Sequence, residues 1–214
     1  MNADARNRTA GDGKTSVALA EDEILRRGLD TFAELGYEAT TVRELARRLK
    51  VSHNFINDRY GSKAHFWRAV VDAAMRERGI EFKTVVEDLP DEERLVAVVT
   101  LFYRAAAQTP AVNRLVADES ARESERLDYL HEHFVEPFWA GIRPTVERLM
   151  ATGRMPRTAM DIVFFAITGP ALAMTHEPLA YRLGRSRDWG GPEREESAEA
   201  MANLVIRGLL PHRS

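Results

Sequence analysis

The sequence predicts an all-α protein, with a compact N-terminal group of short helices followed by a larger helical region. First, apolar side chains recur every three to four residues through most of the chain, which is the period of an α-helix. Second, proline or an acidic residue opens most of these periodic segments, as expected at helix N-termini. Third, no segment shows the alternation of a strand or a repeated βα pattern.

The composition limits the class of protein further. The chain has 214 residues, of which 44% are hydrophobic, so it can form a real core within one large or two small domains. It has no cysteine, which excludes disulfides and thiolate chemistry and fits a reducing cytoplasm. The longest nearly apolar run, Ile162–Met174, is too short for a bilayer of about 30 Å, and residues 1–16 lack the apolar core of a signal peptide. We therefore expect a cytoplasmic protein.

The first part of the chain predicts an arm and a helix. Residues 1–16 are small and polar, which is typical of a disordered N-terminal arm. From Val17 a stripe of apolar residues at helical spacing predicts a helix that Gly36 ends. The stripe consists of Ala20, Ile24, Leu25, Gly28, Leu29, Phe32 and Ala33.

Two short helices are predicted next, joined by a tight turn over residues 41–60. Thr41 begins the first of them, and Glu44 three residues later completes a capping box. Val51 fills the turn, Ser52 caps the following helix, and Gly61 ends it. The inward faces consist of Val42, Leu45, Ala46 and Leu49, and then of Ile56 and Tyr60. Ser62 caps a fourth helix, which we expect to continue to about Leu89.

The rest of the chain predicts longer helices. Their expected bounds are 91–108, 110–120, 124–151, 156–185 and 192–210. Pro137 and Pro144 lie inside the third of these segments. Each removes a backbone hydrogen bond, to the carbonyl of His133 or of Ala140, and favours a kink.

Charge is distributed unevenly along the chain. The net charge is −3, but residues 43–68 hold seven basic and two acidic residues, a local charge of +5. Residues 1–68 sum to +2, with 12 basic and 10 acidic residues, so the remainder is −5. A locally basic surface on an acidic body fits sequence-selective DNA binding, although a solvated helix face gives the same signal.

The outward residues of the helical pair are donors suited to DNA. Thr41 and Arg43, at the start of the first helix, are placed for phosphate, and Arg43 can alternatively reach a guanine edge. The second helix exposes His53, Asn54, Phe55, Asn57, Asp58 and Arg59, of which Asn pairs with adenine and Arg with guanine. Asp58 either accepts from cytosine or neutralises Arg59, and Lys63 suits a backbone phosphate. The alternative is a helical hairpin in an ordinary bundle.

Residues 17–75 resemble the DNA-binding domain of the tetracycline-repressor (TetR) family. The matching pieces are LDTFAELGYEATTVRELARRL, the turn VS and the closing RYGSKAHFWRAV. The resemblance implies phosphate contacts at Thr41, Ser52 and Lys63. It implies groove contacts at His53, Asn54, Phe55 and Asn57, with Arg43 as a further possibility. It divides the chain into the arm 1–16, a DNA-binding domain 17–77 and an effector-binding and dimerisation domain 78–214.

Three positions depart from the family pattern. Lys50 stands where the turn usually has glycine or a small residue, and a left-handed conformation there costs about 1 kcal/mol unless the turn differs. Asn57 replaces a tyrosine that usually contacts DNA, and Arg59 stands where histidine is frequent. The operator sequence therefore cannot be transferred from relatives.

For the larger region, the resemblance implies a homodimer through the helices at 158–185 and 192–210. The kinked segment 124–151 favours a pocket for a small-molecule effector, for which a plain core is the alternative. We expect the pocket lining to include Phe102, Tyr103, Phe134, Phe138, Trp139, Ile142, Met150, Phe164 and Met174. No cofactor is expected, nor a metal, since His131 and His133 face different sides of a helix.

The sequence therefore predicts a DNA-binding transcriptional regulator, a ligand-responsive repressor that binds a palindromic operator as a dimer. A helical carrier or enzyme with an incidental hairpin, and a protein–protein adaptor, are the alternatives. The sequence contains no HExxH, GxSxG or glycine-rich phosphate loop, so we expect no enzyme.

Overall fold

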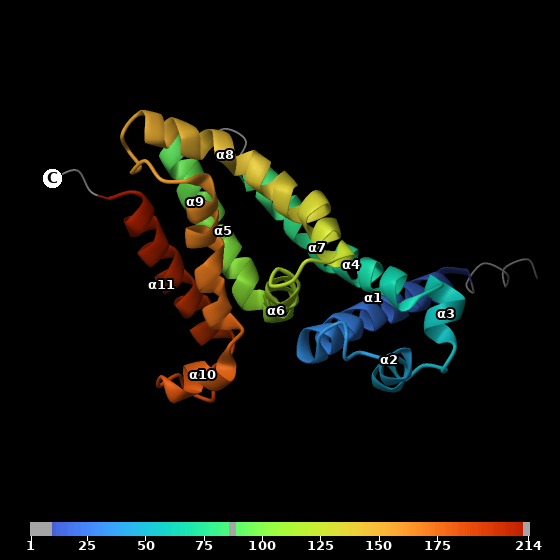
Figure 1. Cartoon of the computed structure of the whole chain (residues 1–214). Coiled ribbons are helices and arrows are strands. Elements are labelled where there is room, and N and C mark those ends of the chain that lie inside the picture. Colours follow the sequence, from blue (N-terminus) through green and yellow to red (C-terminus); the bar gives the residue numbers. More distant parts are fainter. Residues whose placement is uncertain (1–9, 86–88, 212–214) are drawn as a thin grey trace, which may run out of the picture. The chain divides into compact units, whose positions relative to one another are not determined.

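The computed structural model describes residues 10–85 and 89–211, with the side chains of residues 21–76 and 89–211 (Figure 1). These residues form helices and connecting loops, and no strand occurs among them, which confirms the predicted all-α class. The chain divides into two compact units, Met1–Arg76 and Glu77–Ser214.

The first unit contains α1 (Ala10–Leu35), α2 (Val42–Leu49), α3 (Phe55–Tyr60) and the start of α4 (Lys63–Val85). The predicted arm lies partly outside the described residues, and α1 begins at Ala10, before the expected start at Val17. Gly36 ends α1 as predicted, with a left-handed φ of 75°. Ser62 also caps α4 as predicted, because its Oγ accepts from the His65 N–H at 3.1 Å.

The core of the first unit depends on a close approach between α1 and α4. A Cβ atom at Gly28 would lie 2.7 Å from Phe66 Cζ and 2.8 Å from Val70 Cγ2. Glycine therefore allows these helices to pack more closely than any other residue would. The adjoining core is aromatic, since the Phe32 and Phe66 rings are 6.0 Å apart and Trp67 is almost fully buried.

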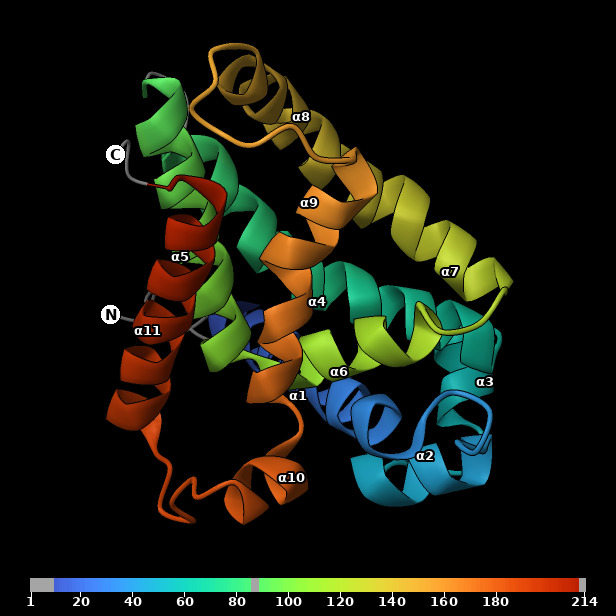
Figure 2. The same ribbon diagram turned by 60° about the vertical axis from the view of Figure 1, so that its left-hand side comes forward.

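Among its described residues, the second unit contains the end of α4 and nine further helical elements. They are α5 (Asp91–Gln108), α6 (Pro110–Glu119), α7 (Glu125–Leu130), η1 (His131–Val135), α8 (Glu136–Ala151), α9 (Met160–Thr168), η2 (Gly169–Met174), α10 (Glu177–Arg182) and α11 (Gly191–Leu209). Figure 2 shows α5 and α11 side by side, and α5 also packs on α8. The predicted bounds of α5 are confirmed, and those of α6 and α11 differ by one residue.

Near Pro137, where a kink was predicted, the structure has a π-helical turn. Residues His131–Val135 form this turn between α7 and α8, and the Glu136 N–H donates to the His131 carbonyl five residues back. Pro137 has no N–H, so α8 begins beside it, where a missing donor costs least. Pro144, in contrast, lies inside α8.

The single helix predicted over 158–185 is wrong. The structure has α9, then the 3₁₀ helix η2, and then α10 after His176. Pro170 and Pro178 each lack an N–H, and each lies at the start of one of the two later elements. Within the described residues, no single helix is long and apolar enough to cross a membrane. Helices α5 and α6 together reach that length and composition, but they are bent by 99°.

Candidate nucleic-acid interface

Helix α2 begins with the predicted cap. The Thr41 hydroxyl accepts a hydrogen bond from the Glu44 N–H at 3.1 Å. The inward face of the helix is buried at Leu45, Ala46 and Leu49. The Glu44 carboxylate does not return to the Thr41 backbone as a capping box would require; it binds Arg47 and Arg48 instead. Thr41 itself is exposed at the end of the helix, where a phosphate could approach.

The turn after α2 places Lys50 in the left-handed conformation, which was expected to be strained for a residue other than glycine. Lys50 has φ 58° and ψ 43°, and it is the one described non-glycine residue with a positive φ. Its N–H donates to the carbonyls of Ala46 and Arg47, and the Val51 N–H donates to Ala46 at 3.1 Å. These bonds hold the turn closed, so they offset a strain of about 1 kcal/mol.

Helix α3 begins later than predicted, at Phe55. Ser52 does not cap it through its side chain, because its backbone carbonyl accepts from the Phe55 N–H at 3.1 Å and forms a turn before the helix. Ile56 is fully buried and fixes the inward face. The Phe55 ring packs edge-on against Tyr60 at 6.3 Å, and Tyr60 packs on Phe66 at 4.8 Å.

Among the exposed polar and charged side chains around this turn and on α2 and α3, five carry amide, imidazole or cationic groups that no carboxylate of the described residues pairs with. They are Arg43, Lys50, His53, Asn54 and Asn57. Arg43 comes from the first turn of α2, the next three from the connecting turn, and Asn57 from the first turn of α3. None of the five has a carboxylate partner among the described side chains. Their amide and cationic donors are thus available to an external acceptor, and their assignment as DNA contacts remains a prediction.

Arg59 is held differently from these five. Its guanidinium forms an ion pair with Glu21 of α1, and the Tyr60 hydroxyl lies 3.4 Å from the same carboxylate. The suggestion that Asp58 neutralises Arg59 is therefore not supported, because Glu21 takes that role. A groove contact by Arg59 requires this pair to open.

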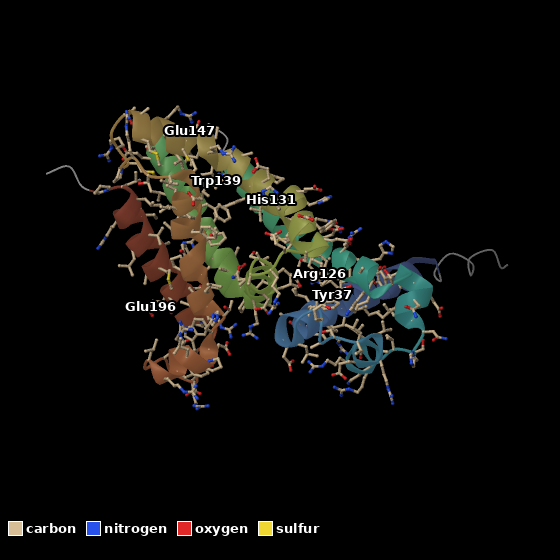
Figure 3. The ribbon with its side chains drawn as sticks, in the orientation of Figure 1. Tyr37, Arg126, His131, Trp139, Glu147 and Glu196 are labelled. Carbon is tan, nitrogen blue, oxygen red and sulfur yellow. The ribbon has the colours of Figure 1, made fainter. Side chains whose placement is uncertain are left out.

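Lys63 also has protein partners. Its Nζ donates to the carbonyls of Tyr37 at 3.0 Å and Thr40 at 2.9 Å. It lies 3.9 Å from the centre of the Tyr37 ring, a cation–π contact. Tyr37, labelled in Figure 3, belongs to the loop between α1 and α2. Lys63, which was predicted to bind a DNA phosphate, thus connects that loop to the start of α4.

Acidic residues of α1 reduce the local positive charge. Arg48 binds Glu34 with two hydrogen bonds, at 2.5 and 3.0 Å, in addition to Glu44. Hydrogen bonds from Arg47 and Arg48 lower the pKa of Glu44 from 4.5 to about 2. The count of +5 over residues 43–68 missed Glu21 and Glu34, because they come from another helix. The exposed positive charge therefore lies mainly on Arg43 and Lys50, and on the exposed part of the Arg47 side chain.

The predicted effector-pocket residues gather in the core of the second unit. Tyr103, Trp139 (Figure 3), Ile142 and Met174 are buried there. Phe102, Phe138, Met150 and Phe164 pack against the same core. The Tyr103 hydroxyl donates to the Ile167 carbonyl at 2.7 Å, which gives it a structural partner. Phe134 lies apart, in ring contact with Tyr129 and His133. The pocket itself remains a prediction.

The fold and the exposed donors define a helix-turn-helix protein with a separate helical unit. Comparison with known proteins finds a family match for this part of the chain. Residues 24–70 match the model described as bacterial regulatory proteins, tetR family. This segment is therefore similar to the TetR family.

Among curated relatives, an HTH-type transcriptional repressor of Mycobacterium tuberculosis, Rv3405c, is 40% identical over 60 residues. That match covers 28% of this chain and 30% of the relative, so it reaches less than a third of the relative's length. Two solved structures share the fold over nearly the whole chain. The ketosteroid transcriptional regulator KstR2 of M. tuberculosis has TM-score 0.70 at 17% identity, covering 89% of this chain and 94% of its own. A TetR-family regulatory protein of Rhodococcus RHA1 has TM-score 0.69 at 19% identity, covering 91% and 98%.

Proposed function

We propose that this protein is a DNA-binding transcriptional regulator, not an enzyme, and that it acts as a repressor. The observation that carries the proposal is the exposed set Arg43, Lys50, His53, Asn54 and Asn57, presented by a rigid turn and the first turn of α3. A short helix with exposed amide and cationic donors at its N-terminus fits the major groove of DNA. A named transcriptional repressor is 40% identical to this chain over 60 residues, which supports the repressor role.

The exposed set divides into two roles. Asn54 and Asn57 can form bidentate bonds with adenine, and Phe55 offers a ring edge to a thymine methyl group. Thr41, Ser52 and Lys50 lie at helix ends and in the turn, where hydroxyl and ammonium groups suit phosphate. His53 and Arg43 lie between these groups and can serve either role.

The protein acts as a homodimer in this proposal. Large apolar side chains are exposed on the elements that replace the predicted dimer helices. They are Ile162 (57% exposed), Phe165 (64%), Leu172 (40%), Leu179 (56%), Leu183 (79%) and Leu204 (71%). Large apolar side chains exposed on these elements favour their use as an interface. A two-fold dimer presents two α3 helices to half-sites about 34–36 Å apart, so the operator is palindromic.

The dimer can be tested at Leu204, which lies on α11. Leu204→Asp places a charge in the proposed interface and should convert the dimer to a monomer in sedimentation equilibrium. Asn203→Asp, at the neighbouring exposed position, is the matched control for charge. A wild-type monomer at micromolar concentration would contradict the dimer, and a Leu204→Asp variant that stays dimeric would contradict the proposed interface at Leu204.

A small apolar molecule is the proposed effector. It would enter the aromatic core around Phe102, Phe138, Trp139 and Phe164, whose rings lie 5.5–6.1 Å apart in pairs. A ligand that binds better to a form with the wrong spacing of α3 helices weakens DNA binding by that difference in affinity. Tryptophan fluorescence with a panel of apolar ligands tests this, since Trp139 lies in the core. If no ligand of the panel both changes its emission and lowers DNA affinity, the apolar-effector proposal fails.

DNA binding can be tested by fluorescence anisotropy against the DNA upstream of the protein's own gene. We expect saturable binding at moderate salt, with a tenfold or larger excess over unrelated DNA. Asn57→Ala should change the preferred bases, whereas Asn113→Ala, in the second unit, serves as a control outside the helix-turn-helix. Equal affinity for all DNA sequences, or an unchanged preference in the Asn57→Ala variant, would refute the assigned role.

A further inference from the structure

A second polar site lies in the second unit, around α10 and the loop after it. A hollow of about 470 Å³ is lined by Pro178, Tyr181, Arg182, Arg185 and Arg187. Its volume is within the range of small-molecule sites. Three of the five lining residues are arginines, and none is acidic. The hollow does not include any residue of the aromatic core or of the helix-turn-helix.

Each of the three guanidinium groups has a contact within the protein that leaves its positive charge uncompensated. Arg182 Nη1 donates to the Pro178 carbonyl at 2.8 Å, and Arg185 Nη1 donates to the Ala173 carbonyl at 2.9 Å. The Arg187 guanidinium lies 5.5 Å from the centre of the Tyr181 ring. A guanidinium has five N–H donors, so one bond to a carbonyl leaves most of them available.

A buried tryptophan fixes the position of Arg185. Its guanidinium stacks 4.0 Å from the centre of the Trp189 ring. Trp189 is 8% exposed and belongs to the core of this unit. Its Nε1 donates to the Glu193 carbonyl at 3.2 Å. Because the partner is rigid, little conformational entropy remains for Arg185 to lose when it binds a ligand.

No carboxylate of the described residues forms an ion pair with these three arginines. The nearest acidic residue of α10, Glu177, pairs with Arg194 at 3.5 Å. Several other arginines of the unit do have such partners, as Arg126 has Glu119, Arg148 has Asp91 and Arg154 has Glu92. In a chain with net charge −3, three arginines without an ion pair around one hollow are a local concentration of positive charge.

We propose that this hollow binds the phosphate group of a small molecule. The planar fork of a guanidinium matches two phosphate oxygens, and arginine is favoured over lysine where such bidentate binding occurs. Three positive charges match a dianionic phosphate better than a single carboxylate, since a phosphate monoester carries about −1.5 to −2. The ligand is either inorganic phosphate or an organic phosphate monoester. The site shares no residue with the exposed set of the helix-turn-helix or with the proposed apolar-effector site.

Isothermal titration calorimetry with inorganic phosphate, adenosine 5′-monophosphate and adenosine tests the proposal at constant ionic strength. We expect one saturable site per chain for a phosphate-bearing probe and none for adenosine. The double variant Arg185→Gln/Arg187→Gln should weaken binding at least about tenfold. Arg207→Gln, an exposed arginine on α11 outside the hollow, is the matched control and should bind as the wild type does. Tighter binding of the nucleotide identifies a phosphate ester, and equal binding identifies free phosphate.

Trp189 provides a second readout that does not depend on heat. A phosphate that engages Arg185 changes the stacking on the Trp189 ring, so its emission should change with the same midpoint as the calorimetric curve. Trp189→Phe should remove the fluorescence change, and circular dichroism confirms that each variant is folded. The proposal is overturned if no phosphate-bearing probe saturates, if the double variant binds normally, or if Arg207→Gln loses as much. It is also overturned if the double variant weakens duplex DNA binding as much as Arg43→Gln does, since the arginines would then contact DNA and not a small molecule.

Discussion

Lys63→Met should destabilise the helix-turn-helix unit by about 2–3 kcal/mol. The substitution keeps most of the apolar stem and removes the ammonium group. That group makes hydrogen bonds of 3.0 and 2.9 Å to the carbonyls of Tyr37 and Thr40. Bonds to a charged donor contribute about 1.5–3 kcal/mol each, but Lys63 is half-buried, so we take about 1 kcal/mol for each bond. The cation–π contact at 3.9 Å adds about 0.5 kcal/mol.

Urea unfolding followed by Trp67 fluorescence measures this loss. Trp67 is almost fully buried and packs edge-on against Tyr37 at 6.3 Å, so it reports on the loop that Lys63 fastens. Replacing Trp139 and Trp189 with phenylalanine in every variant isolates the signal. A domain of this size should also lose about 10 °C or more in melting temperature.

Arg43→Met is the matched control, since Arg43 is an exposed cation on α2. Its unfolding free energy should stay within about 0.5 kcal/mol of the wild type. A Lys63→Met variant that is equally stable would refute the structural role. The salt dependence of DNA binding then separates the two functions of Lys63. Loss of a phosphate contact lowers the slope of log K against log salt by about 0.9 per protomer, whereas loss of a purely structural bond leaves the slope unchanged.

Three further predictions concern the same unit. Gly28→Ala gains about 1 kcal/mol of helix propensity but places a Cβ at 2.7 Å from a core ring. Because overpacking costs about 1–3 kcal/mol, we expect a net loss of about 1 kcal/mol in urea unfolding, and a gain in stability would contradict it. The lowered pKa of Glu44 contributes stability that is full above pH 4.5 and is lost as the pH falls toward about 2. The stability difference between the wild type and Glu44→Gln should therefore shrink over that range, and a constant difference would argue against the ion pairs. Glu21→Gln releases Arg59 and should change DNA affinity or base preference, and an unchanged binding profile would exclude Arg59 from the interface.

Local signals in the sequence predicted most helix ends correctly. Gly36 and Gly61 adopt positive φ and end their helices, and Thr41 and Ser62 cap the next ones. These signals work because a cap or a left-handed glycine acts within one turn of its own helix. Ser52 is the exception. Its backbone already closes a turn to Phe55, so the helix begins two residues later than its side chain suggested.

Longer helices were predicted less well, because proline effects depend on position within the fold. Pro137, Pro144, Pro170 and Pro178 each remove one backbone donor. Pro144 is accommodated inside α8, Pro137 follows a π-helical turn, and the other two coincide with the start of a new element. The apolar pattern of Ile162–Met174 continues on both sides of Gly169 and Pro170, which concealed the first of these breaks. The bonds to the Tyr37 and Thr40 carbonyls could not be predicted either, since they join residues more than twenty positions apart.

The pairing of Arg59 changes how the interface is expected to recognise DNA. Its partner Glu21 is 38% exposed and Arg59 itself is 41% exposed, so water and salt weaken the pair. An exposed ion pair contributes about 0–1 kcal/mol, whereas a bidentate contact from arginine to guanine discriminates by about 1–3 kcal/mol. In the proposed DNA complex we therefore expect Arg59 to exchange Glu21 for a guanine edge, but only at a site that offers guanine in the right place. At any other base we expect the guanidinium to keep its carboxylate, so that its charge does not attract the DNA. Under this proposal Glu21 makes Arg59 selective, and Asn54 and Asn57 are the predicted contacts that operate without a competing partner.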